Sequence, residues 1–217
     1  MVRMLVERGV DPAKTYLQYN WALEATRPDV PRDVPSHKGV RLLYAGNIGD
    51  MQDLGTAVRA AHRSADAGVH LTLVGEGVAR QELQGLVAEL GSTNIEFKGR
   101  VPRDEMGPAY ASSDYSLVTL KDLPNFRGTI PSKFQASLYQ GLPIITTVQG
   151  DVRRIVEDLN VGFTADAESV DSLEEAFRRA AELGTDERES MAGRARGAYT
   201  ELFSLNAGVC GIERTLV

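Results

Sequence analysis

A cation and a helix start lie close together near the middle of the sequence. Residues 127–147 read as a tight turn, a short helix that ends at Gly141 and a buried strand, and Lys133 falls in the first turn of that helix. Pro131 pre-sets the backbone for this turn. A helix start points free N–H groups and the positive end of its dipole outward, which suits a phosphate or diphosphate. The alternative is that Pro131 and Gly141 only delimit an ordinary α/β unit.

The elements that would position this stretch alternate regularly from residue 40 onward. Apolar runs predict six strands, at residues 40–45, 70–74, 94–98, 115–120, 144–147 and 162–165. The segments between and after them predict helices, at residues 52–65, 78–90, 104–111, 131–141, 152–159 and within 170–203. This alternation predicts an α/β fold: a doubly wound, Rossmann-like parallel sheet of about six strands with helices on both faces.

Loops that contain glycine follow four of the predicted strands, at the edge where such sheets bind ligands. They are Gly46-Asn47-Ile48-Gly49, Gly75-Glu76-Gly77, Gly99-Arg100-Val101 and residues 128–133. Each loop alone is weak evidence, because a turn between strand and helix often needs glycine. Four in one sheet favour a bound ligand. The sequence has neither the GxGxxG dinucleotide fingerprint with its acidic residue nor a P-loop.

Composition narrows the class of protein. The chain has 217 residues, 42% of them apolar and 25% charged, and a net charge of −6 with both signs interspersed, which argues against a nucleic-acid surface. The start carries no signal-peptide core, and no apolar run approaches the roughly 20 residues of a spanning helix. The single cysteine, Cys210, excludes an internal disulfide, and the three histidines are too scattered to suggest a metal site.

The first 35 residues do not join the regular pattern. Residues 2–9 predict a short helix, residues 15–19 alternate like a strand, and residues 27–35 carry three prolines that predict an extended connector. We therefore divide the chain into residues 1–35 and a domain of residues 36–217. The first piece is too short to bury its own apolar side chains, so it is expected to dock on the domain or to self-associate.

Taken together, these motifs resemble family 4 of the retaining GT-B glycosyltransferases. The residues that carry the resemblance are Tyr44-Ala-Gly-Asn-Ile-Gly49, Leu73-Val-Gly-Glu-Gly77, Phe97-Lys-Gly-Arg-Val101, Pro131-Ser-Lys133 and Gly141-Leu-Pro-Ile-Ile145. The resemblance covers residues 5–199 and is nearest to bacterial enzymes that add amino sugars in O-antigen, capsule or other envelope glycan assembly. It implies that residues 36–217 are the C-terminal, donor-binding half of a GT-B fold, with C-terminal helices. Residues 1–35 would then be a remnant of the acceptor-binding domain plus a proline-rich linker.

The resemblance also implies an activity. The whole enzyme would be a hexosyl or N-acetylhexosaminyl transferase that moves a sugar from a nucleotide-sugar, with a UDP-sugar favoured, to a glycan or lipid-linked acceptor. It would need no cofactor and no metal, would bind no nucleic acid, and would work in the cytoplasm, touching a membrane surface only through the missing half. This chain alone would be inactive. Two alternatives stay open: a GT-B sugar-nucleotide epimerase and a non-catalytic nucleotide-binding α/β module.

Site residues follow from the matching positions of the family. The diphosphate would be faced by Gly46, Asn47 and Gly49, and the nucleobase would be bordered by Gly99, Arg100 and Val101. The phosphates would be held by Gly128, Thr129, Ile130, Pro131 and Ser132, with Lys133 and Arg127 as the candidate catalytic cations. Many members have Arg in place of Asn47, Lys near Gln52, and a pair of glutamates where this chain has Gly128 and Ala136. The ribose contact is therefore unassigned.

Overall fold

The computed structural model describes residues 2–21 and 39–216, so the proline-rich connector and the predicted boundary at residue 35 lie outside the described residues. One sheet of six parallel strands has the order β3-β2-β1-β4-β5-β6. The strands are β1 (Val40–Ala45), β2 (Val69–Val74), β3 (Ile95–Lys98), β4 (Tyr115–Val118), β5 (Ile144–Thr146) and β6 (Gly162–Thr164). The predicted doubly wound α/β fold is confirmed.

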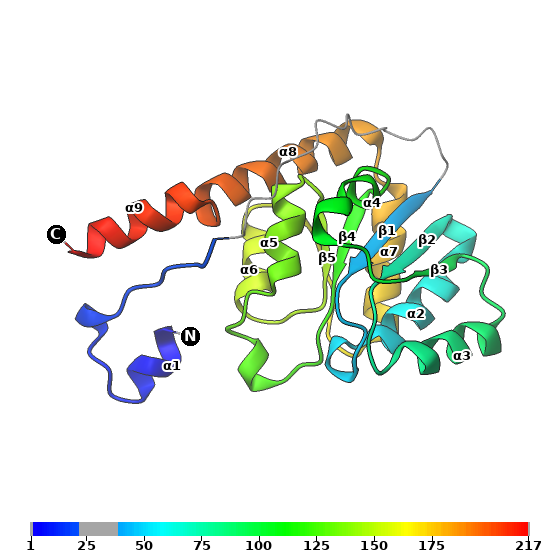
Figure 1. Cartoon of the computed structure of the whole chain (residues 1–217), viewed down its shortest axis with the longest axis horizontal. Helices are drawn as coiled ribbons and strands as arrows, with labels where there is room; N and C mark the ends of the chain where they lie inside the picture. The colour runs from blue at the N-terminus through cyan, green and yellow to red at the C-terminus, as the bar shows by residue number, and fades with distance from the viewer. Residues whose placement is uncertain (1, 22–38, 217) are drawn as a thin grey trace.

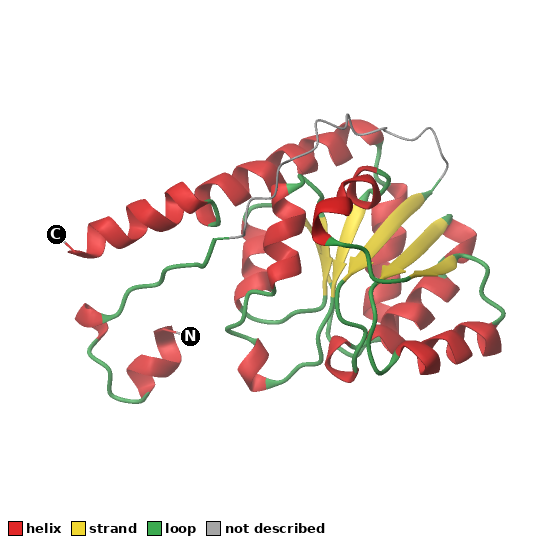
Figure 2. Ribbon diagram, viewed as in Figure 1, coloured by secondary structure: helices red, strands yellow, loops and turns green. Residues whose placement is uncertain are grey.

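Helices cover both faces of the sheet (Figures 1 and 2). The domain helices are α2 (Leu54–Arg63), α3 (Arg80–Leu90), α4 (Gly107–Ala111), α5 (Ser132–Tyr139), α6 (Asp151–Asp158), α7 (Val170–Glu182) and α8 (Thr185–Leu202). Short 3-10 turns lie at Asp50–Gln52, Ala65–Ala67, Arg103–Glu105 and Pro124–Phe126. The predicted helical stretch 170–203 is thus two helices, separated at Leu183 and Gly184.

The core is divided by the sheet because neighbouring strand residues point to opposite faces. Leu42 and Tyr44 of β1 pack with α2, α3 and α7 in one cluster. Leu43 lies on the other face with Met106, next to α4. The helices α5, α6 and α8 share a third cluster that includes Phe134 and Phe203. Strands β4 and β5 are buried along their whole length, which explains their continuous apolar sequence.

The two ends of the chain extend beyond this domain (Figure 1). The C-terminal end is α9 (Leu205–Leu216), which the sequence did not predict, and the N-terminal end carries α1 (Val2–Glu7) and a 3-10 turn at Pro12–Lys14. The prediction of a strand at residues 15–19 is wrong, since this segment has no regular structure. The segment reaches helices instead of a sheet edge: the rings of Tyr19 and Phe203 lie 5.1 Å apart, and Gln135 donates to the carbonyl of Asn20 at 2.6 Å.

Residues 18–21 run across the face of α9 that carries two glycines. A methyl group at Gly208 would lie 2.3 Å from the Trp21 ring, and one at Gly211 would lie 1.8 Å from the Gln18 amide. Leu205, Val209 and Ile212 of α9 are exposed. Within residues 2–21 and 39–216, none of the helices has the length and apolar character that a membrane span needs.

Gly208→Ala should displace Trp21 from α9, because the added methyl group has no space beneath the indole ring. Trp21 is the single tryptophan of the chain, so its fluorescence reports the displacement directly. We expect a red-shifted emission and stronger quenching by acrylamide. The matched control is Gly197→Ala in α8, where a methyl group would meet no atom within 4 Å. Identical quenching in the two variants would contradict this packing.

Candidate functional site

Loops after β1, β2 and β3 meet at the carboxyl edge of the sheet, as expected. They line a cavity of about 500 Å³, and the loop after β3 is the segment that leads to α4. Its lining residues are Ala45, Gly46, Asn47, Val74, Gly75, Glu76, Arg100, Val101, Pro102, Arg103 and Met106. The cavity lies beside the point between β1 and β4 where the strand order reverses, which is where open α/β sheets bind ligands.

The loops after β1 and β2 hold each other in place. Backbone N–H groups of Gly46 and Ile48 donate to the carbonyls of Val74 and Glu76, both at 2.9 Å. The two chains approach so closely that a methyl group at Gly75 would lie 1.9 Å from the carbonyl oxygen of Gly46. Gly75 also has φ +144°, which residues with a side chain rarely adopt. The shape of the loop after β1 is therefore imposed by the loop after β2.

Lys133 of α5 points to this same loop. Its Nζ lies 3.8 Å from the centroid of the Tyr44 ring, and a methyl group at Gly46 would lie 3.3 Å from Nζ. Burial lowers the pKa of Lys133 to about 7. Among the described residues, no carboxylate pairs with its ammonium. A partly buried cation without an acidic partner, beside glycine backbone, is an arrangement that an anionic ligand would complete.

The start of α5 adds backbone donors near Lys133. Pro131 is the N-cap residue, so α5 begins one position later than predicted, and no side chain accepts a hydrogen bond at this cap. The first N–H groups of a helix have no partner within the helix. Gly141, with φ +68°, follows the C-cap residue and ends the helix as expected. Lys133 and the α5 start therefore present positive charge on the same side of the domain.

Tyr44 is a contributor that the sequence did not reveal. Its hydroxyl donates to the carbonyl of Asn47 at 2.5 Å, while its ring carries the ammonium of Lys133. Burial raises the pKa of Tyr44, so the hydroxyl stays protonated and remains a donor. The only sequence signal was an aromatic residue immediately before the glycine-bearing loop.

Other predicted site residues lie outside the cavity. Gly49 lines a separate hollow of about 440 Å³ with Asp50, Asp53 and Lys121, among others. Gly99 lies next to the carboxylate of Glu76. A methyl group at Gly99 would lie 3.6 Å from Oε1 of Glu76. The predicted residues of the segment before α5 and at its start do not line the cavity; these are Gly128, Thr129, Ile130, Pro131 and Ser132.

Arg127 is placed differently from Lys133. Its guanidinium donates to both carboxylate oxygens of Asp122, at 2.9 and 2.7 Å. This pairing raises the pKa of Arg127 and lowers that of Asp122. The backbone carbonyl of Arg127 accepts from Asp151 N–H at 3.0 Å, which ties the segment before α5 to the start of α6. The charge of Arg127 is thus compensated within the protein.

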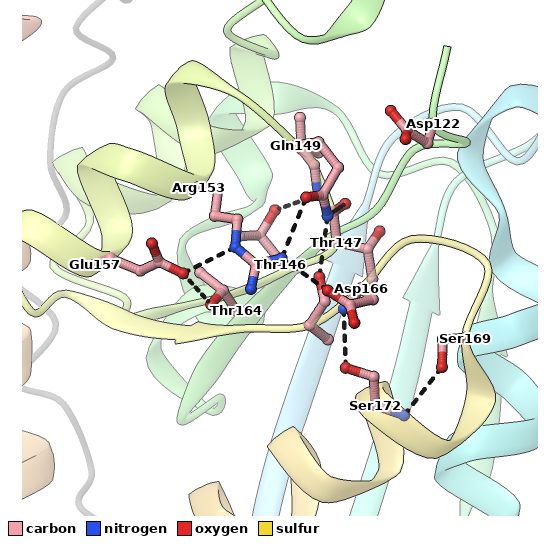
Figure 3. Close-up of polar contacts among 12 residues, drawn as sticks. Asp122, Thr146, Thr147, Gln149, Arg153, Glu157, Thr164, Asp166, Ser169 and Ser172 are labelled. Carbon is pink, nitrogen blue, oxygen red and sulfur yellow. Dashed lines mark hydrogen bonds and ion pairs between the residues drawn. The ribbon is translucent and has the colours of Figure 1, made fainter.

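A second polar network, at the ends of β5 and β6, is also compensated internally (Figure 3). Arg153 donates to Glu157 and to Asp166, both at 2.9 Å. It also donates to the side chain of Gln149 at 3.2 Å, and Gln149 in turn donates to the carbonyl of Thr147 at 2.9 Å. Since both signs of charge are present and paired, this network holds the two loops together and offers little attraction to an anion.

Comparisons with known proteins agree with this architecture. The family model "Glycosyl transferases group 1" matches residues 28–198. The putative colanic acid biosynthesis glycosyl transferase WcaI of Escherichia coli (strain K12) is 25% identical over 199 residues, covering 83% of this chain and 47% of the relative. The chain thus spans about half the length of this curated relative.

Solved structures share the fold. A glycosyltransferase from Rickettsia africae ESF-5 superimposes with a TM-score of 0.78 and 16% identity, over 98% of this chain and 60% of that chain. Anabaena Alr3699/HepE, in complex with UDP and glucose, gives 0.72 and 16%, over 99% and 60%. Because the family model covers most of the chain and includes every strand of the sheet, the chain belongs to the group 1 glycosyl transferases.

Proposed function

We propose that this chain is the donor-binding half of a retaining glycosyltransferase that uses a UDP-sugar to extend a glycan or lipid-linked acceptor in bacterial envelope polysaccharide synthesis. The observation that carries the proposal is Lys133, a cation beside the loop after β1 that has no acidic partner among the described residues. A nucleoside diphosphate supplies the missing anion. The proposal is supported by the colanic acid relative and by the UDP and glucose complex of HepE.

The transfer reaction requires positive charge beside the departing diphosphate. Transfer breaks the bond between the anomeric carbon and a diphosphate oxygen, and the electron pair of that bond stays with the diphosphate. In the proposal, Lys133 and the N–H groups at the start of α5 stabilise this growing charge. Losing one such preorganised donor typically raises the barrier by about 2.7 to 4 kcal/mol. These groups take the role that a metal fills in other enzymes, so we propose transfer without a metal or other cofactor.

Transfer itself belongs to the whole protein in this proposal. Holding the acceptor hydroxyl in reactive geometry against the anomeric carbon supplies roughly 7 to 11 kcal/mol in well-oriented reactions. We assign that task to an acceptor-binding domain outside this chain, consistent with a relative of about twice the length. The chain alone is therefore expected to bind the donor and to transfer little or no sugar.

The test is nucleotide binding by the purified chain. With half of the cleft absent, we expect UDP to bind with a dissociation constant on the order of 0.1 to 1 mM, and uridine to bind more weakly. At roughly 10 mM UDP this affinity adds about 1.4 to 2.7 kcal/mol to the free energy of unfolding. The melting temperature should rise by about 3 to 10 °C.

Two results would contradict the proposal. The absence of any shift with UDP, or with the diphosphates of guanosine, adenosine and thymidine, would favour a module that binds no nucleotide. Release of an epimerised sugar nucleotide without an acceptor would instead identify an isomerase.

A further inference from the structure

Glu76 is the one acidic residue that lines the 500 Å³ cavity. It follows β2, the strand next to β1, and lies between Gly75 and Gly77. A methyl group at Gly77 would lie 2.1 Å from the carbonyl oxygen of Ile48, so both flanking glycines press against the loop after β1. The Ile48 N–H also donates to the Glu76 carbonyl. The position of Glu76 is thereby fixed relative to the backbone that faces the diphosphate.

The carboxylate of Glu76 is compensated and still accessible. Its Oε1 lies 3.1 Å from Nη1 of Arg80, and its side chain is 55% exposed. Arg80 is itself held by the carbonyls of Gly75 and Lys98, at 2.7 and 3.0 Å, and its guanidinium lies over the Phe97 ring. Within the described residues, the ion pair of the Glu76 carboxylate runs through Oε1, and no hydrogen bond or ion pair is formed by Oε2.

This arrangement favours a neutral polyol over a second anion or cation. A bare carboxylate beside a diphosphate site would repel the ligand, but Arg80 cancels that charge. A carboxylate accepts strong hydrogen bonds from hydroxyl groups. In dinucleotide-binding sheets an acidic side chain near the phosphate loop binds the ribose hydroxyls in the same way.

We propose that Glu76 accepts hydrogen bonds from the ribose hydroxyls of the nucleoside diphosphate. The assignment rests on the proposed function, because it requires the diphosphate to lie at the loop after β1 and at Lys133. Ribose is the next unit along such a ligand, and Glu76 lies on the neighbouring strand end.

The experiment compares UDP with 2′,3′-dideoxyuridine diphosphate, which keeps the base and the diphosphate but lacks both hydroxyls. Chemical-shift titrations give the ratio of the two dissociation constants for the unchanged chain, Glu76→Ala, Glu76→Gln and the control Glu89→Gln, an exposed acid on α3. We expect the unchanged chain and the control to prefer UDP by at least about tenfold. In Glu76→Ala the preference should fall to about twofold or less, with Glu76→Gln in between.

The ratio is the informative quantity because removing Glu76 also frees the charge of Arg80, which affects both ligands equally. A full preference for UDP in Glu76→Ala would overturn the assignment while leaving the proposed function intact. Failure of the unchanged chain to bind either diphosphate would overturn the proposed function and the assignment with it. Circular dichroism confirms that each variant is folded.

Discussion

Replacing Lys133 with methionine should weaken UDP binding by about 10- to 150-fold, the range for one charge-assisted hydrogen bond. The melting temperature should stay the same or rise, because the folded chain no longer holds a desolvated cation without an acidic partner. Isothermal titration and thermal unfolding measure the two effects. Undiminished affinity would show that the diphosphate lies elsewhere.

The matched control is Lys98→Met. Lys98 is an exposed lysine whose ammonium lies 3.5 Å from Glu96, and it lines a different hollow from the 500 Å³ cavity. The Lys98→Met variant should lose no more than about twofold in affinity for UDP. Equal losses in the two variants would mean that the effect comes from net charge instead of a contact at the site.

The same substitution should remove a pH dependence of binding. In the free chain Lys133 is charged below its pKa of about 7 and neutral above it. A bound diphosphate favours the charged form, so above pH 7 the complex holds more protons than the free chain and affinity falls as pH rises, by at most tenfold per unit. The second ionisation of a phosphate group, near pH 6, acts in the opposite direction. Lys133→Met should show no decline between about pH 7 and 9.

The fold could be predicted because each strand and each loop is marked by residues within its own short stretch of sequence. Strands buried on both faces give unbroken apolar runs such as residues 115–118 and 144–146. Glycines mark the loops between them, and the carboxyl ends of parallel strands necessarily share one edge. The position of Lys133 near the loop after β1 followed from this topology.

Contacts between distant segments could not be predicted in the same way. The ammonium of Lys133 lies over the Tyr44 ring because the fold brings the start of α5 close to the end of β1. The prediction of a strand at residues 15–19 is wrong for a related reason. An alternating pattern does not show whether a sheet edge is available for pairing, and in the structure Tyr19 packs on Phe203. Arg127 had a carboxylate five residues away, yet no helical or strand period indicates the pairing in a loop.

The difference between Lys133 and Arg127 shows what a candidate cation needs. Both lie within residues 127–147, and both side chains can carry a positive charge. Arg127 is exposed and bound in bidentate fashion by Asp122, an arrangement that stabilises the segment before α5. The ammonium of Lys133 lies beside the Tyr44 ring and the backbone of Gly46, and it has no acidic partner in the part of the chain that the structure describes. The role of the leaving-group cation therefore falls to Lys133 in the proposed mechanism.

Gly75→Ala should be the most destabilising change among these variants, by about 2 to 6 kcal/mol in the free energy of unfolding. Its φ of +144° is nearly closed to other residues, and the methyl group would lie 1.9 Å from the carbonyl oxygen of Gly46. The loop after β1 must move to admit it, so the surviving folded protein should also bind UDP more weakly. Urea unfolding and UDP titration measure both consequences.

Gly85→Ala is the matched control, because Gly85 lies inside α3 and a methyl group there would meet no atom within 4 Å. Alanine is the better helix former, so this variant should gain about 0.5 to 1 kcal/mol and keep its UDP affinity. If the free energy of unfolding of Gly75→Ala instead stayed within about 1 kcal/mol of that of the unchanged chain, Gly75 would not lie so close to the Gly46 carbonyl. The loop after β1 would then owe its shape to its own sequence. The fixed spacing between Glu76 and the backbone proposed to face the diphosphate would lose its structural basis.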